Sequence, residues 1–545
     1  MFLDALRTLN SAAAEFSAVP KEQCMKQTRV GVLESIVAHF SERGARFVWL
    51  RGSPGTGKTA IAKSLCEDLD NNQRLAASFF FDKNRGGDDV DSTARFISTL
   101  AFQLGNVNRV YRRLLVGILR NQPNILHTPL TRQLQALIIE PMRKACEGHY
   151  FSNTRHIIVL DGLDECHEKS PLDDLMELVA QLQQLPDHFI IFVSSRPEQP
   201  ILHTWEDFEG PLYIENLDNI NAESDIRHYV IQQLRDHRWT PGKANSSEET
   251  PSLFELGTFA DLCGGLFLIT EIRVREVKKA PGNGETSIDA FRRILNDPEG
   301  TVEEMEKEYL RILRHAYLRA KVRDDVVERY RRVMSAILSL KDALNIDGIS
   351  QLLGEDKLKV QAALGLISCV VDIPKEGPVR LYHATFREFL VGNPNTLDCD
   401  EREQRLLFFH DVGGFLGPYC LRVLNSNLCR NLDTPSNSAD LNTQFMAFYS
   451  HYKEAMDDEL GSHVRYAAYH WAEHVEPVIS LGDMQDLFCA FLKGCLLPWA
   501  VLVSMFRAGG DRDGLVKCTN LLRVGYKTCD DSSSHNQTFA ETPGC

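Results

Sequence analysis

The stretch FVWLRGSPGTGKTAIAKSL, residues 47–65, decides the fold of this chain. Its first four residues form an apolar run of strand length, and the last six have the spacing of a helix. Residues 52–59, between them, follow the pattern G-x-x-x-x-G-K-T, whose glycines let backbone N–H groups turn toward phosphate oxygens at a helix N-terminus. The residues predicted to surround the phosphates are Gly52, Ser53, Pro54, Gly55, Thr56, Gly57, Lys58, Thr59 and Ala60. We expect Lys58 to reach the β- and γ-phosphates and the Thr59 hydroxyl to bind Mg²⁺.

Further apolar runs of strand length alternate with helical stretches up to about residue 216. They lie at 77–81, 156–161, 189–195 and 212–216. Near-continuous apolar strands separated by helices indicate a parallel sheet covered on both faces. The sequence therefore predicts an α/β P-loop NTPase fold. Mostly helical texture follows it, interrupted by a small mixed unit at about 345–392.

The segment HIIVLDGLDE, residues 156–165, supplies the second half of the predicted site. An apolar strand ending in Asp161 places a carboxylate at the same sheet edge as the phosphate loop, where it can hold Mg²⁺ together with Thr59. Asp164 and Glu165 follow where they could orient or deprotonate an attacking water. The alternative is a solvated acidic turn that caps the next helix.

The segment VSSRPE, residues 193–198, also leaves a strand at this edge. Arg196 can reach a γ-phosphate with its fixed positive charge and so respond to whether that phosphate is present. The alternative is a surface arginine paired with Glu198. The chain has no Asn-Lys-x-Asp tetrad of the kind that reads guanine, so ATP and ADP are favoured over GTP.

Composition excludes several classes of protein. With 60 Lys and Arg against 75 Asp and Glu, the 545 residues carry a formal net charge of −15, which argues against a nucleic-acid or membrane-surface binder. The basic-looking stretch 311–333 alternates in sign, as a solvated helix face does. No 18 apolar residues run together, so we expect no membrane span. The 14 cysteines contain no Cys-x-x-Cys pair, which indicates reduced thiols in a cytoplasmic protein.

Three motifs in this order, GSPGTGKT, LDGLDE and SSRPE, resemble the NACHT module of STAND-class signal-transduction NTPases, the group that includes NOD-like receptors. Residues 74–104 are similar to fungal NACHT proteins and to the nephrocystin-3-like N-terminal NTPase domain. The resemblance covers roughly residues 28–395. It implies a resting ADP form that self-oligomerises and signals to a further protein when ATP replaces ADP. It also implies a fungal role in innate immunity or self/non-self recognition.

The resemblance carries over to two further positions. Gly264 and Gly265, in LCGGLFL, match a segment that opens a helix under the nucleotide; the alternative is a plain helix break. His383, in His-Ala-Thr-Phe, matches a histidine thought to touch the ADP β-phosphate, although Thr385 replaces the family's serine there. A lone histidine on an apolar strand can equally be a satisfied core residue.

Residues 344–390 predict two short helices, a hairpin turned at 375–378 and a closing helix, the layout of a winged helix. The division expected is a short N-terminal helix at 1–28, the NACHT core at 29–216, a helical subdomain at 217–300, a helix and winged helix at 301–395, a helical region at 396–525 and a disordered tail at 526–545.

Two other functions stay open at this stage. One is a constitutively cycling ATPase motor, and the other is a nucleotide-bound scaffold that docks partners through helices 400–525. The repeat array and effector domain usual for the family have no counterpart in the sequence. This leaves a minimal N-terminal signal, an effector supplied by a partner, or a truncated chain as expectations.

Overall fold

The chain forms two compact units in the computed structural model. Unit 1 comprises Met1–Arg311 together with Tyr382–Phe386, and unit 2 comprises Ile312–Leu381 and Arg387–Cys545. The finer six-part division stays a prediction. The residues that the structure describes are 6, 9, 14–18, 22–42, 46–83, 85, 90–147, 154–166, 172–239, 250–296, 305–318, 323–392, 399–409, 412–428, 461–475 and 484–506. The predicted tail at 526–545 and half of the predicted N-terminal segment at 1–28 lie outside them.

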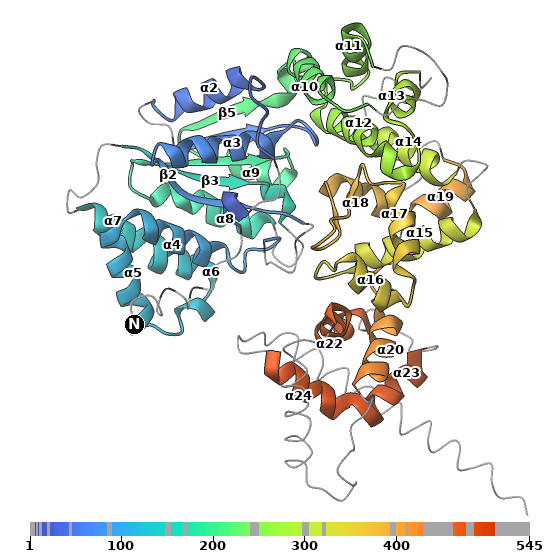
Figure 1. Ribbon diagram of the computed structural model, residues 1–545. Coiled ribbons are helices and arrows are strands. Elements are labelled where there is room, and N and C mark those ends of the chain that lie inside the picture. Colours follow the sequence, from blue (N-terminus) through green and yellow to red (C-terminus); the bar gives the residue numbers. More distant parts are fainter. Residues whose placement is uncertain are drawn as a thin grey trace, which may run out of the picture. The chain divides into compact units, whose positions relative to one another are not determined.

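Unit 1 is built on a five-stranded sheet in which every pairing is parallel. The strand order is β2-β3-β4-β1-β5 (Figure 1). The strands are β1 (Phe47–Arg51), β2 (Leu75–Phe80), β3 (His156–Asp161), β4 (Phe189–Ser195) and β5 (Leu212–Asn216). All five strands predicted from the apolar runs are thus confirmed.

Alternate strand residues fill two separate cores, one on each face of the sheet. Phe47 and Trp49 of β1 lie in one core, whereas Val48 and Leu50 lie in the other, as the two-residue period of a strand requires. β3 and β4 are buried along their whole length, which explains their unbroken apolar sequence.

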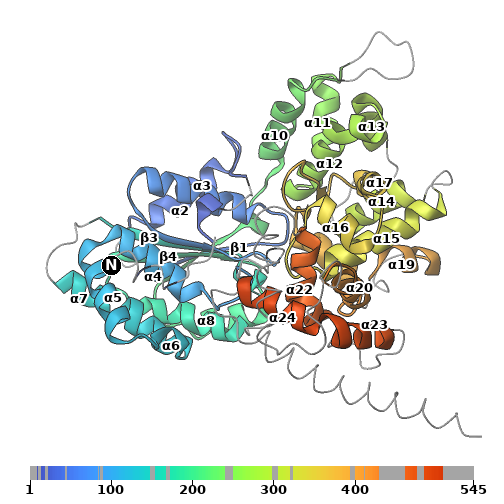
Figure 2. The same ribbon diagram turned by 60° about the horizontal axis from the view of Figure 1, so that its bottom comes forward.

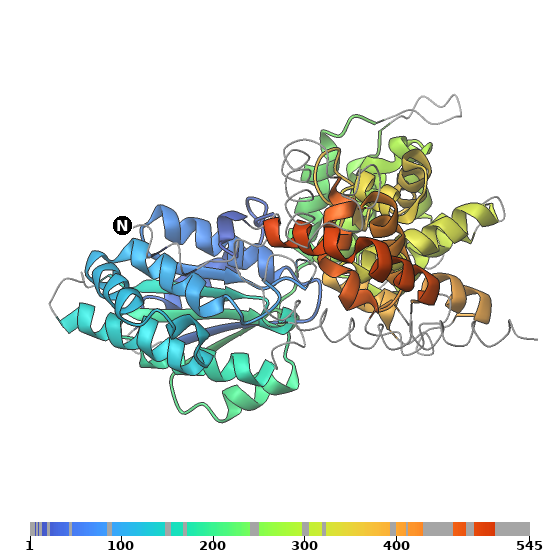
Figure 3. The same cartoon turned by 90° about the horizontal axis from the view of Figure 1, so that it is seen from below.

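Helices cover both faces, so the predicted α/β P-loop fold class is confirmed (Figures 1 and 3). The first face carries α2 (Val30–His39) and α3 (Lys58–Asn71). The second face carries α4 (Phe96–Val107), α5 (Arg109–Asn121), α7 (Glu140–Glu147), α8 (Leu172–Gln181) and α9 (Gln199–Glu206), with the short α6 (Leu130–Gln133) leading through a π-helical turn into α7.

The rest of unit 1 is helical. Ser252 and Glu255 form a capping box at the start of α11, and the Thr286 side chain caps α13. Polar residues directly before these two helices therefore set where each one begins. The helices are α10 (Glu223–Arg235), α11 (Leu253–Asp261), α12 (Phe267–Lys279), α13 (Ser287–Leu295) and α14 (Met305–Tyr317), of which residues 305–311 belong to this unit.

Unit 2 contains the elements expected between residues 344 and 390, which follow a long helix at 324–339. The predicted order of two helices, hairpin and closing helix is confirmed, whereas the name winged helix stays a prediction. The strands β6 and β7 pair antiparallel through Val371 and Leu381. The elements are α15 (Asp324–Ser339), α16 (Ile346–Leu353), α17 (Lys357–Gly365), β6 (Val371–Asp372), β7 (Arg380–Leu381) and α18 (Ala384–Val391), whose first turn belongs to unit 1.

The later described part of unit 2 is also helical, and α20 and α22 pack against each other (Figure 2). Trp471 is fully buried among Phe488, Phe491 and Trp499. The helices are α19 (Glu401–Leu407), α20 (Gly417–Asn427), α22 (Ser462–Val475), α23 (Gln485–Ala490) and α24 (Leu496–Phe506), the last two joined by a π-helical turn.

Two observations modify the expectations from composition. One described helical stretch, Gln485–Val503, is long and apolar enough to cross a membrane, although half of it is buried within the protein and core helices share these properties. Cys489 and Cys495 are disulfide-bonded, so the expectation of reduced thiols was wrong for them. Because neither residue belongs to a Cys-x-x-Cys pair, their spacing gave no sign of this. Eight other described cysteines are free.

A histidine in α22 makes the stability of unit 2 depend on pH. His470 Nε2 lies 2.8 Å from Asp342 Oδ2, and Nδ1 lies 3.6 Å from Glu473 Oε1. Burial lowers the pKa of His470, but Asp342 and Glu473 together raise it to about 9. Since the folded-state pKa exceeds the unfolded one, the stabilisation is complete below about pH 6.5 and disappears as the pH rises through 9.

We therefore expect Asp342→Asn to destabilise unit 2 by about 1 to 2 kcal/mol at pH 6.5, a value reduced for the exposure of Asp342. The difference from wild type should vanish near pH 9.5. Thermal melts at the two pH values measure this difference. An equal difference at both values would show that the His470 charge is not involved.

Candidate functional site

The predicted phosphate loop lies between the carboxyl end of β1 and the first turn of α3. Gly55 and Gly57 have φ of 81° and 92°, a backbone conformation that glycine adopts readily. Gly57 is the N-cap of α3, and Lys58 and Thr59 are the first two residues of that helix. The loop is thus followed by the positive end of a helix, which favours an anion.

Strand register brings Asp161 to the same edge of the sheet. Leu50 of β1 pairs with Ser194 of β4, and Ser194 pairs with Asp161 of β3. The Ser194 hydroxyl donates a hydrogen bond to Asp161 Oδ1, which orients this buried carboxylate. A hydroxyl at Thr59 and a carboxylate at Asp161 are oxygen donors of the kind that Mg²⁺ prefers, so the residues present fit this ion.

Lys58 folds back over the loop. Its Nζ donates to the carbonyl oxygens of Gly52 and Ser53 at 2.7 and 2.9 Å. Desolvation lowers the pKa of Lys58, while the charges of Asp164, Asp161 and others oppose the shift. The lysine and the acidic residues predicted for the site therefore lie within electrostatic reach of one another.

The buried Asp164 pairs with Arg196, which is half-buried. The Arg196 backbone N–H donates to Asp164 Oδ1 at 3.0 Å, and Arg196 Nε lies 3.1 Å from Asp164 Oδ2. Asp164 therefore positions Arg196, whose expected alternative partner was Glu198. Glu165 ends the same short 3₁₀ turn and is the other carboxylate predicted to act on water.

Two residues that the sequence did not single out hold the loop. Asp218, just after β5, accepts a hydrogen bond from the Ser53 N–H at 2.8 Å. Its position at the carboxyl end of a strand is the same signal that pointed to Asp161. Arg29 is buried, donates to the Thr56 carbonyl at 2.9 Å and lies 5.0 Å from the centre of the Phe267 ring. Arg29 precedes α2 and has no motif of its own, so sequence reasoning missed it.

The residues carried over by resemblance lie outside the sheet. Gly264 and Gly265 have φ of 60° and 76° in the turn before α12. His383 Nε2 lies 3.6 Å from Glu271 Oε2 on α12, and about a third of its side chain is exposed. A contact of His383 with the β-phosphate stays a prediction.

Residues 34–196 match the family model described as Nephrocystin 3, N-terminal. The match starts in α2 and ends at Arg196, so it spans the phosphate loop, Asp161 and the Asp164–Arg196 pair. The chain carries a P-loop NTPase domain. No curated protein matches the chain.

The chain is also similar to several solved structures at low sequence identity. A STAND protein with a tetratricopeptide repeat sensor from Pyrococcus horikoshii is 13% identical, with 92% of this chain and 72% of that chain covered and a TM-score of 0.39. A Walker-type ATPase of Pyrococcus abyssi is 11% identical, with 68% and 98% covered and a TM-score of 0.33. Cdc6p from Pyrobaculum aerophilum is 13% identical, with 67% and 92% covered and a TM-score of 0.32.

Proposed function

We propose that this P-loop NTPase domain is an ATP/ADP-binding switch of the STAND and NACHT type. One observation carries the proposal: the phosphate loop is bonded directly to a helix outside the sheet. The Leu268 N–H of α12 donates to the Gly55 carbonyl at 3.2 Å. If a nucleotide moves the loop, this hydrogen bond passes the movement directly to α12. Such a transmitted movement is what a nucleotide switch requires.

The site residues divide the work of binding and hydrolysis. Lys58 and the loop N–H groups hold the phosphates, and Thr59 and Asp161 hold Mg²⁺. The ion, when bound, neutralises charge on the β- and γ-phosphate oxygens. Glu165 positions the attacking water, and Asp164 orients Arg196 so that its guanidinium can report the γ-phosphate. As part of the same NACHT-type proposal, we expect Mg²⁺-dependent hydrolysis to be slow.

The wider role follows from the resemblance to NACHT proteins. We propose that the ADP form rests in the cytoplasm and that the ATP form self-oligomerises and engages a signalling protein. His383 would read the β-phosphate. A role in innate immunity or self/non-self recognition is part of the same proposal.

Comparing the protein with ADP and with a non-hydrolysable ATP analogue tests the switch. We expect a monomer with ADP, a larger assembly with the analogue and Mg²⁺, and no assembly for Lys58→Ala, measured by light scattering after gel filtration. Turnover of about 1 s⁻¹ or faster would instead support a constitutive ATPase. An unchanged assembly state with both nucleotides would favour a scaffold.

A further inference from the structure

Five residues near the end of the hairpin return to unit 1. Tyr382–Phe386 belongs to unit 1, whereas the residues on both sides of it belong to unit 2. We call these five residues the return segment. Their side chains contact two helices of unit 1, α12 and α14.

The contacts with α12 use one side of that helix. Arg275 lies 3.5 Å from the centre of the Tyr382 ring, and Lys279 Nζ donates to the Tyr382 hydroxyl at 2.9 Å. Glu271 lies beside His383. Glu271, Arg275 and Lys279 are spaced four residues apart, so they lie on one face, and two cations are directed at a single aromatic residue.

The contacts with α14 are made by Tyr309. Its hydroxyl lies 2.7 Å from Thr385 Oγ1, and its ring centre lies 4.9 Å from that of Phe386. Tyr309 and Phe386 are almost fully buried. The return segment is therefore held by specific polar and aromatic contacts along its length.

The other end of α12 contacts the phosphate loop. A Cβ atom on Gly55 would lie 2.9 Å from Leu268 Cβ, which leaves no space between the loop and the first turn of α12. Phe267, in the same turn, packs against Arg29, which itself donates to the Thr56 carbonyl. Because packed interfaces deform little, the loop backbone cannot shift without moving α12.

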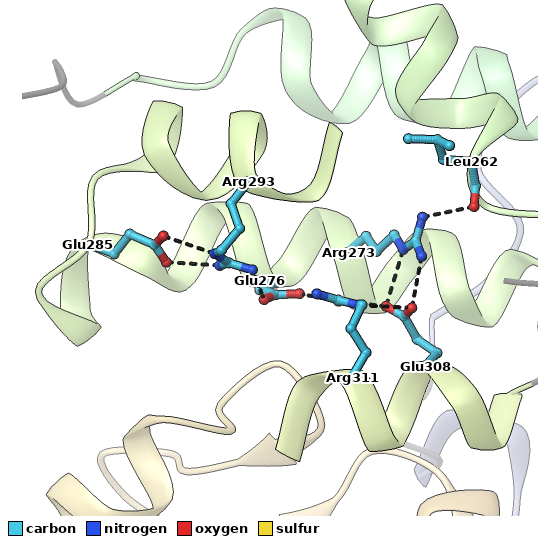
Figure 4. A network of polar contacts seen from close by, with 7 residues as sticks. All are labelled: Leu262, Arg273, Glu276, Glu285, Arg293, Glu308 and Arg311. Atoms are coloured by element: carbon cyan, nitrogen blue, oxygen red, sulfur yellow. Dashed lines mark hydrogen bonds and ion pairs between the residues drawn. The ribbon is translucent and has the colours of Figure 1, made fainter. Parts of the chain in front are cut away.

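Buried ion pairs stiffen α12 on a different side of the helix. Arg273 of α12 contacts Glu308 of α14 at 2.9 Å, and Glu276 of α12 contacts Arg311 of α14 at 2.7 Å. In order, the network joins the Leu262 carbonyl, Arg273, Glu308, Arg311, Glu276, Arg293 and Glu285 (Figure 4). Helix α12 and residues 305–311 of α14 are therefore held together by buried ion pairs.

We propose that α12 couples the phosphate loop to the return segment, so that the attachment of Tyr382 to Arg275 and Lys279 regulates nucleotide affinity. The inference rests on the proposed function and adds a regulatory contact to it. Coupling between two sites is reciprocal. If the ADP-bound loop favours the attached segment, then loss of the attachment weakens ADP binding.

ADP affinity of full-length variants measures the coupling. We expect Tyr382→Leu to weaken ADP binding at least fivefold, because about fivefold is the smallest change in affinity that coupled sites typically show. Tyr382→Phe keeps the ring beneath Arg275 and loses only the hydroxyl, so its effect should be smaller. Tyr419→Leu is the matched control, because Tyr419 is a half-buried tyrosine with its own arginine, Arg422, 5.5 Å from the ring centre.

A second measurement covers the case in which Tyr382→Leu fails to fold. In wild type, ADP should slow amide hydrogen exchange in residues 380–391. Equal ADP affinity for wild type and Tyr382→Leu, or the same amide exchange rate in residues 380–391 with and without ADP, would overturn the coupling. Either result would leave the proposed function intact. Wild type that binds no nucleotide would overturn the proposed function, and the coupling with it.

Discussion

Lys58→Ala is expected to weaken the binding of ADP and ATP by at least about 100-fold. The lysine ammonium would lose charge-assisted contacts with the phosphates, each worth about 1.5 to 3 kcal/mol, and two such contacts correspond to about two to four decades in affinity. Lys58 Nζ donates to the Gly52 and Ser53 carbonyl oxygens of its own loop, so the fold should survive its replacement. Isothermal titration with each nucleotide gives the affinities.

Lys63→Ala is the control for Lys58→Ala. Lys63 lies on the same helix, five residues further along, and its replacement removes the same charge from α3. Its effect on ADP affinity should stay within about twofold. An unchanged ADP affinity in Lys58→Ala would contradict the assignment of the phosphate loop.

The second large effect is expected at Glu308 in α14. This carboxylate is fully buried and is shared by Arg273 and Arg311. Burial alone would raise the pKa of Glu308, but the two arginines hold it below its usual value. Glu308→Gln removes the carboxylate charge that Arg273 and Arg311 share, although Arg311 keeps its contact with Glu276. Breaking a buried ion pair in this way typically costs about 3 to 5 kcal/mol.

Hydrogen exchange in α12 and α14 measures this cost locally, which avoids assuming one unfolding transition for a chain of two units. We expect protection to fall by about two to four orders of magnitude in Glu308→Gln. Glu306→Gln, an exposed change on the same helix, should have almost no effect. Similar protection in both variants would mean that the network does not hold α12 to α14.

The sheet and the edge of the site could be predicted because their signals are local. Apolar runs of strand length gave all five strands, and the position of Asp161 after one of them placed it beside the phosphate loop. This works because the carboxyl ends of parallel strands share one edge. The expected pattern of helices, hairpin and closing helix after residue 344 has the same local origin.

The contacts that hold the loop and α12 could not be predicted, because they join residues distant in sequence. Arg29 reaches Thr56, and nothing local marks this contact; Asp218 reaches Ser53, and its place at the end of a strand gave a signal but not the partner. The start of the basic-looking stretch was misjudged for the same reason. Arg311 was expected on a solvated face, but it is buried between Glu276 and Glu308, and Glu276 comes from another helix.

The nucleotide content of the full-length protein, purified without added nucleotide, tests the central claim most directly. Native mass spectrometry should find one ADP bound per chain in wild type and none in Lys58→Ala. The ADP should stay bound when Mg²⁺ is present. An empty wild-type site, or ATP hydrolysis at about 1 s⁻¹ or faster, would contradict an ADP-held resting state.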